Sequence, residues 1–64
     1  MKVKDLLKVL YEFTEIGIFE YGSARGKFFY QVKFVDPKYF DREIAQVSAS
    51  SDETDVIEIF LKKL

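Results

Sequence analysis

The chain has 64 residues, with ten basic and eleven acidic side chains and a net charge of −1. It contains no histidine, cysteine or tryptophan. That composition excludes disulfide bonds, Cys/His metal sites and the side chain that most often serves as general acid or base near neutral pH. Because the charges nearly cancel, general attraction to nucleic acid or to an anionic membrane is disfavoured. We therefore expect a protein that is not an enzyme and needs no cofactor or metal.

Phenylalanine and tyrosine make up 17% of the residues. A domain of this length buries only about 60% of the surface that its unfolded chain exposes. The chain should form a single domain over residues 1–64. Because one small core cannot easily bury this many rings, we expect the domain to form a dimer or larger homo-oligomer. The alternative is a compact core filled with rings. The chain has neither a long apolar run nor a signal-peptide cleavage pattern, which predicts a cytoplasmic protein without membrane association.

The first predicted element is a helix over residues 3–13, where apolar side chains recur at the i, i+3, i+4, i+7 spacing of one helix face. From residue 15 to residue 21 the apolar pattern changes to a period of two, which predicts a strand. Gly22 and Gly26 then suit a hairpin loop, because glycine adopts positive φ without strain.

Residues 27–35 alternate most clearly and predict a second strand. Asp36 and Pro37 are typical of a helix start, so we expect a single helical turn over residues 36–40. Further strands are predicted over residues 44–49 and 55–62, with a polar loop over residues 50–54.

These elements predict an α+β fold in which the N-terminal helix packs on a four-stranded antiparallel meander, since consecutive strands usually pair. One helix covers only one face of such a sheet, and the other face must meet solvent, a second subunit or a target. The open face should carry Phe19, Tyr21, Phe29 and Phe60, or the alternate residues if the faces are reversed. We expect Tyr21, Phe29 and Phe60 to contact a partner.

Without histidine, only carboxylates and lysines remain as candidate general acids or bases. Asp41 and Glu43 flank Arg42 and would share one face of a strand, as a metal or hydrolase site requires. Two carboxylates at this spacing are more often a structural ion pair or a turn cap, and that is the interpretation we favour. The serines lack a histidine to activate them.

The loop over residues 22–27 invites comparison with a phosphate-binding loop. It departs from that pattern, because three residues rather than four separate its glycines and Phe28 stands where Ser or Thr should ligate magnesium. Arg25 and Lys27 nevertheless lie near aromatic rings, a combination that binds nucleotides or single-stranded nucleic acid. An ordinary hairpin loop with solubilising charges is the favoured interpretation.

Several segments together resemble short phage and prophage proteins of Gram-positive bacteria. They are the Met-x-Val-Lys-x-Leu-Leu start of residues 1–7, the proline-led turn of residues 37–40, Asp-Arg-Glu-Ile at residues 41–44 and the alternating strand after residue 55. The resemblance implies an accessory protein, and several such proteins antagonise host defence by binding an immune protein, such as a CRISPR effector, or a nucleotide signal.

Three hypotheses follow. The first is a non-enzymatic phage or prophage accessory protein that binds a host protein in the host cytoplasm, in the manner of an anti-CRISPR. The second is a nucleotide-binding or single-strand-binding protein that uses Arg25 and Lys27. The third, placed last, is a metal-dependent enzyme built on Asp41 and Glu43.

Overall fold

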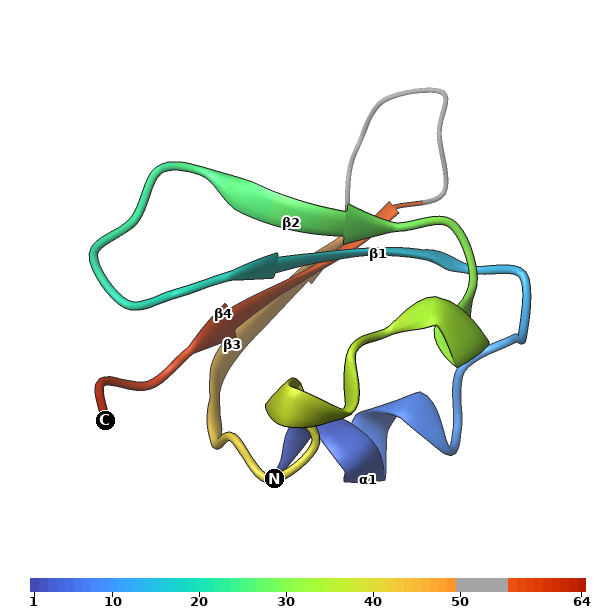
Figure 1. Ribbon diagram of the computed structural model, residues 1–64, viewed down its shortest axis with the longest axis horizontal. Helices are drawn as coiled ribbons and strands as arrows, with labels where there is room; N and C mark the ends of the chain where they lie inside the picture. The colour runs from blue at the N-terminus through green and yellow to red at the C-terminus, as the bar shows by residue number, and fades with distance from the viewer. Residues whose placement is uncertain (50–55) are drawn as a thin grey trace.

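Four strands form one mixed sheet in the computed structural model of the protein, which describes residues 1–49 and 56–64. The spatial order is β2-β1-β4-β3, with β1 and β4 parallel in the centre and both outer pairs antiparallel (Figure 1). The bounds are Glu15–Phe19 for β1, Gly26–Phe29 for β2, Ile44–Ala49 for β3 and Val56–Leu61 for β4. With one short helix beside it, the fold is a small α+β domain.

The predicted antiparallel meander is wrong, because β2 and β3 are not neighbours. The connection between them leaves the plane of the sheet and forms two 3-10 helices, η1 (Val32–Phe34) and η2 (Pro37–Tyr39), on one face. Val35 and Tyr39 are buried there against the core. Pro37 also lacks the amide that a central strand needs. A connection with buried anchors of its own therefore takes β3 to the far side of β4.

The helix α1 spans only Val3–Leu7, and the predicted extension to residue 13 is wrong. It begins at the predicted residue, Val3, and the Asp5 carboxylate accepts a hydrogen bond from the Lys2 amide at 3.0 Å. Beyond α1 the side chains of Val9 and Tyr11 are exposed. The Glu12 carbonyl accepts a hydrogen bond from the Val32 amide at 3.1 Å, so this segment is bound to η1 and does not continue the helix.

The remaining elements follow the sequence pattern more closely. The second strand ends six residues earlier than predicted, at Phe29. The helical turn after Asp36 is confirmed as η2, with the Asp36 side chain accepting a hydrogen bond from the Lys38 amide at 3.0 Å. β3 has the predicted bounds, and β4 lies within its predicted range. The predicted loop over residues 50–54 lies outside the described residues.

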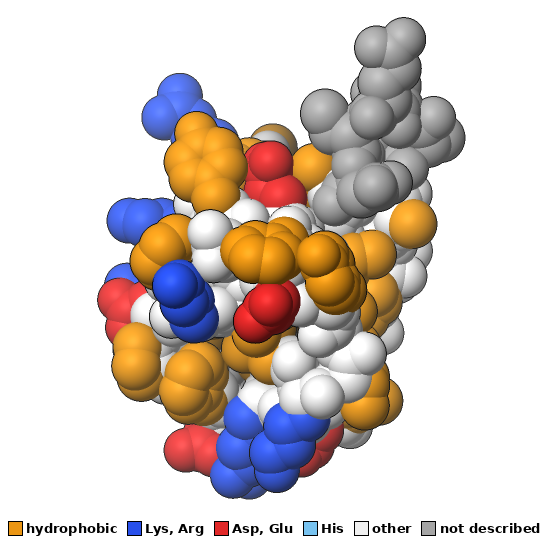
Figure 2. Space-filling view, turned by 90° about the vertical axis from the view of Figure 1, so that its right-hand side faces the viewer, with side chains coloured by type: hydrophobic (Ala, Val, Ile, Leu, Met, Phe, Trp, Pro, Cys, Tyr) orange, Lys and Arg blue, Asp and Glu red, His pale blue; other side chains and the backbone are white. Residues whose placement is uncertain are grey.

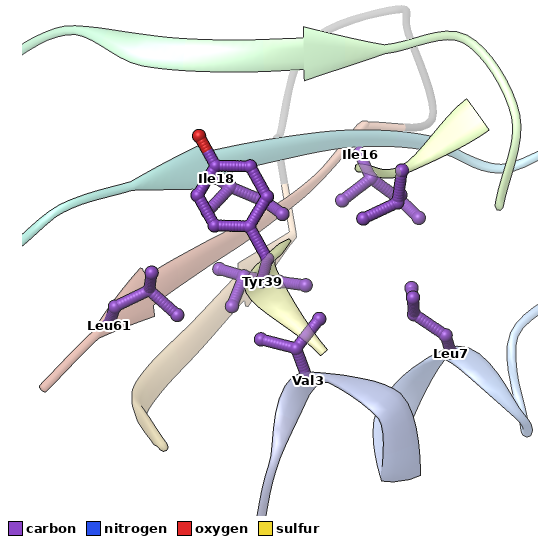
Figure 3. Packing of buried hydrophobic residues seen from close by; sticks show 8 residues of the cluster. Val3, Leu7, Ile16, Ile18, Tyr39 and Leu61 are labelled. Atoms are coloured by element: carbon purple, nitrogen blue, oxygen red, sulfur yellow. The ribbon is translucent and has the colours of Figure 1, made fainter. Parts of the chain in front are cut away.

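The core lies between the sheet and a layer made of α1, η1 and η2 (Figures 1 and 3). Ile16 and Ile18 of β1 point toward this layer, as do Ile59 and Leu61 of β4. A register shift at Ala45 interrupts the alternation of β3. The layer supplies four buried partners: Val3, Leu7, Val35 and Tyr39. We call this side of the sheet the covered face and the other side the open face.

Candidate protein-binding surfaces

The open face carries a cluster of three phenylalanines. Phe19 stacks on Phe60, with ring centroids 4.9 Å apart and planes inclined by 21°. Phe28 meets Phe19 edge to face at 5.9 Å. Strand register brings them together, since Phe19 lies opposite Phe60 on β4 and Phe28 sits on the neighbouring strand β2.

Two glycines leave room for these rings close to the backbone of the sheet. Gly26 is opposite Phe19 and Gly17 is opposite Phe28. A Cβ atom at Gly26 would come within 2.6–2.9 Å of three Phe19 ring atoms, and one at Gly17 would come 2.7 Å from the Phe28 ring. Phe19 is consequently only 9% exposed, whereas Phe28 at the strand edge is 52% exposed. The open face is thus largely covered by its own rings.

The three predicted contact residues do not share one surface. Phe60 lies half-buried on the open face, within the ring cluster. Tyr21 lies past the end of β1 and is well exposed. Phe29 was expected on the open face, and that assignment is wrong: it pairs with Ile16, and its ring packs 6.2 Å from Tyr39 on the covered face. Directly paired residues point to the same side of a sheet, so register decides the side.

Four exposed rings lie at the end of the molecule where β1 begins and β2 ends. We define the aromatic end as Tyr11, Phe13, Tyr30 and Phe34, each more than half exposed. Tyr11 and Phe13 meet edge to face at 5.4 Å. The hydrogen bond between Val32 and Glu12 ties their turn to the segment after β2. Figure 2 views this end and shows apolar side chains over its surface with single charged groups between them.

Sequence reasoning missed the aromatic end, because it placed these residues inside a long helix and a long strand. Tyr11 and Phe13 follow α1, while Tyr30 and Phe34 follow β2. The available signal was the low helix propensity of the β-branched and aromatic residues after Lys8. A shorter helix would have released both rings to a turn.

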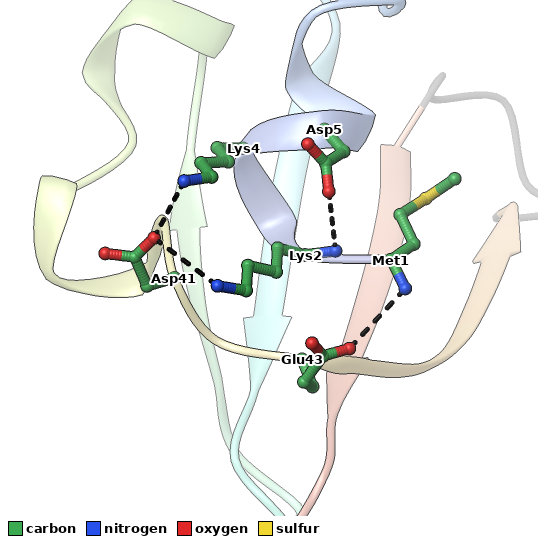
Figure 4. A network of polar contacts seen from close by, with 6 residues as sticks. All are labelled: Met1, Lys2, Lys4, Asp5, Asp41 and Glu43. Atoms are coloured by element: carbon green, nitrogen blue, oxygen red, sulfur yellow. Dashed lines mark hydrogen bonds and ion pairs between the residues drawn. The ribbon is translucent and has the colours of Figure 1, made fainter.

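Asp41 and Glu43, the candidate catalytic carboxylates, are engaged in ion pairs with the start of the chain (Figure 4). Asp41 lies 3.0 Å from the Lys4 ammonium and 4.0 Å from that of Lys2. Glu43 lies 3.5 Å from the terminal amino group of Met1. The hydrogen bond from Lys4 lowers the pKa of Asp41. Ion pairing, the favoured interpretation, is what the structure shows.

Arg42, which lies between these carboxylates in the sequence, forms a bidentate ion pair with Glu20. Its guanidinium nitrogens lie 2.9 and 2.7 Å from the two carboxylate oxygens. This hydrogen bonding lowers the pKa of Glu20. The pair joins the end of β1 to the segment that enters β3. Among the described residues, no three Asp or Glu side chains group closely enough to hold a metal ion.

Of the two cations in the nucleotide hypothesis, Lys27 does not share a side of β2 with Phe28. Lys27 pairs with Ile18 and therefore leaves β2 on the side opposite to Phe28. Arg25 lies in an exposed turn, where its amide and carbonyl both bond the Ser23 hydroxyl. The loop is thus built as a hairpin connection with outward charges.

Comparison with protein-family models, curated proteins and solved structures finds no match to this chain. Within residues 1–49 and 56–64, no helix is both long and apolar enough to cross a membrane.

Proposed function

We propose that this chain is a non-enzymatic binding domain that contacts a protein partner through the aromatic end. The observation that carries the proposal is the gathering of four rings, each more than half exposed, on two turns joined by a backbone hydrogen bond. Tyrosine and phenylalanine are enriched in protein interfaces, and buried aromatic anchors dominate binding energy there. Exposed apolar patches of this kind mark interaction sites.

The distribution of apolar residues supports this choice of surface. The covered face is filled mainly by aliphatic side chains, and two of the three open-face rings are largely covered: Phe19 is buried and Phe60 is half-buried where the two rings stack. The rings of the aromatic end keep most of their area for a partner. Each would contribute about 1.5–3 kcal/mol if binding removed it fully from water.

We further propose that the partner is a host defence protein and that the chain acts as a phage accessory protein in the host cytoplasm. The residues of the N-terminal segment and the Asp-Arg-Glu-Ile tetrapeptide support this role through their resemblance to such proteins. Self-association through the same rings is part of the proposal, since one apolar patch serves either contact.

Site-specific photo-cross-linking in cells tests the surface. A photoreactive phenylalanine replaces Phe13 or Tyr30 in turn, and the matched control replaces Lys27, an exposed residue of β2. In a Gram-positive host that carries a defence system, positions 13 and 30 should form an adduct with one host protein, and position 27 should not. An adduct at twice the mass of the chain would identify self-association.

Two outcomes would contradict the proposal. Equal adducts at all three positions would show that contact is not specific to the aromatic end. Phage plating on the defended host provides the functional readout: wild-type protein should restore plaques, and a variant carrying Phe13→Ser and Tyr30→Ser should not. If both proteins act equally, the aromatic end is not the working surface.

A further inference from the structure

A groove of about 410 Å³ lies on the helical side of the molecule, away from the open face. Its apolar floor is formed by Leu7 of α1, Val32 of η1 and Phe40, which follows η2. Its volume falls within the range of about 300–1,000 Å³ that is typical of ligand sites. The remaining lining residues are all lysines: Lys4, Lys8 and Lys33.

The rim of this groove is locally positive, although the chain as a whole carries a net charge of −1. Lys4 is paired with Asp41 at 3.0 Å. Among the described residues, no carboxylate forms an ion pair with Lys8 or Lys33. The Lys33 ammonium lies 5.4 Å from the centroid of the Phe34 ring. Two cations therefore flank an apolar floor without a neutralising partner in this part of the structure.

We propose that this groove binds an acidic amphipathic segment of a partner protein, whose apolar side chains occupy the floor while its carboxylates meet Lys8 and Lys33. The floor offers contact with apolar side chains, and the charged rim selects carboxylates, which is charge complementarity of the kind that sets specificity. An amphipathic helix laid in a hydrophobic groove is an established mode of peptide recognition.

The lining also argues against a nucleic-acid ligand. Apart from the three ammonium groups, the side chains of the groove carry no hydrogen-bonding group that could recognise a base or a sugar. None of the residues that line the groove belongs to the aromatic end. Failure of peptide binding in the groove would therefore leave the proposed function of the aromatic end untouched, and the reverse also holds.

The test uses two synthetic helical peptides of identical length. Both carry leucines at i and i+4 on one face; glutamates flank them in the first peptide and lysines in the second. Titration calorimetry should show binding of the glutamate peptide only. Amide chemical-shift changes should centre on Leu7, Val32 and Phe40. The variant with Lys8→Glu and Lys33→Glu should bind at least about tenfold more weakly.

A second variant with Lys27→Glu and Lys63→Glu has the same net charge and serves as the control, because both residues are exposed and neither lines the groove. Circular dichroism establishes that both variants are folded. Equal weakening by both variants, or equal binding of both peptides, would overturn the proposal. A further titration uses decanoate, a small amphiphile with a carboxylate. If decanoate binds in the groove and the glutamate peptide does not, the groove binds a small amphiphile and the assignment to a peptide is wrong.

Discussion

Ile59 and Phe60 are adjacent on β4, but their side chains meet different surroundings on the two faces of the sheet. Ile59 points into the covered face and is fully buried by residues from other elements. Phe60 points to the open face, where its main neighbour is the Phe19 ring on the next strand. One face is therefore buried by a separate layer of chain, and the other is covered by its own rings lying over glycines.

This difference shows that the number of aromatic residues on a sheet face overestimates the apolar area available to a partner. Contact between the rings removes most of Phe19 and part of Phe60 from water without a second layer, and Gly17 and Gly26 make room for the rings. Four of the rings that stay exposed lie together at the aromatic end. Substitutions on each surface should therefore separate stability from binding.

Ile59→Ala should have the largest effect, because it empties space in the centre of the covered face. Truncation of a buried isoleucine costs about 2–5 kcal/mol. A domain of this length has a total stability of about 3–10 kcal/mol, so the substitution should remove a large fraction of it. Urea denaturation followed by far-ultraviolet circular dichroism measures the change.

Val47→Ala is the matched control for that truncation. Val47 lies opposite Ile59 on β3 but is 42% exposed at the sheet edge. Its truncation should cost less than about 1 kcal/mol, since surface substitutions seldom cost more. Equal losses for the two variants would show that the covered face is not the dominant core.

Gly26→Ala tests the open face and should have the next largest effect. Its Cβ would lie 2.6–2.9 Å from Phe19 ring atoms, and that ring is held against Phe60. Forcing extra volume into a packed site costs about 1–3 kcal/mol. Gly17→Ala is the matched variant and should cost less, because the facing Phe28 ring is half exposed and free to swing outward. Chemical denaturation of both variants measures the difference, and similar losses would mean that the cluster is equally tight at both glycines.

The sequence predicts the bounds of the last two strands most closely. In β3 and β4 the apolar pattern and the observed strand ends nearly coincide. The pattern runs on past α1 and β2, but in the structure the segments after them bind each other through Val32 and Glu12. The apolar pattern shows which residues are able to face a core, but contacts between segments distant in the sequence determine where an element ends.

The topology and the site depend on contacts between distant residues, which periodicity does not contain. The rule that consecutive strands pair fails here because Val35 and Tyr39 anchor the connection to the core. Phe28 and Phe29 are chemically equivalent neighbours, so alternation alone leaves either one on the open face. Pairing of Phe29 with Ile16 settles the choice, and only the three-dimensional register reveals it.

The Glu20–Arg42 pair at the end of β1 should respond to pH. The covered face should not, because no polar or charged residue is buried among the described residues. Hydrogen bonding to Arg42 lowers the pKa of Glu20 below its usual 4.5. Stability from a carboxylate with a lowered pKa is present above the unfolded-state pKa and is lost as the pH falls through the folded-state pKa. Glu20→Gln should therefore flatten part of the acid dependence.

The measurement is the urea midpoint at several pH values from about 6 down to about 3. The loss near neutral pH should be about 1 kcal/mol or less, since the Glu20 side chain is half exposed and water screens the pair. Asp41 acts in the same direction, because Lys4 lowers its pKa from 3.8. The opposite shift of Lys4, whose pKa is raised above 10.5, affects stability only in strongly alkaline solution. If the urea midpoint of Glu20→Gln falls with pH as steeply as that of the wild type, the Glu20–Arg42 pair does not contribute to stability.

Tyr30→Ser should have the smallest effect on folding and a large effect on binding. Tyr30 is 78% exposed, so its replacement should change the free energy of unfolding by no more than about 0.5 kcal/mol. If the aromatic end is the contact surface, the same substitution should reduce cross-linking to the partner from position 13. Phe28→Ser on the open face removes a ring that is also half exposed, but it should cost stability through the lost contact with Phe19 and leave cross-linking from position 13 intact. If binding were instead lost in Phe28→Ser and kept in Tyr30→Ser, the partner would contact the open face, because the exposed ring needed for binding would then be Phe28 and not Tyr30.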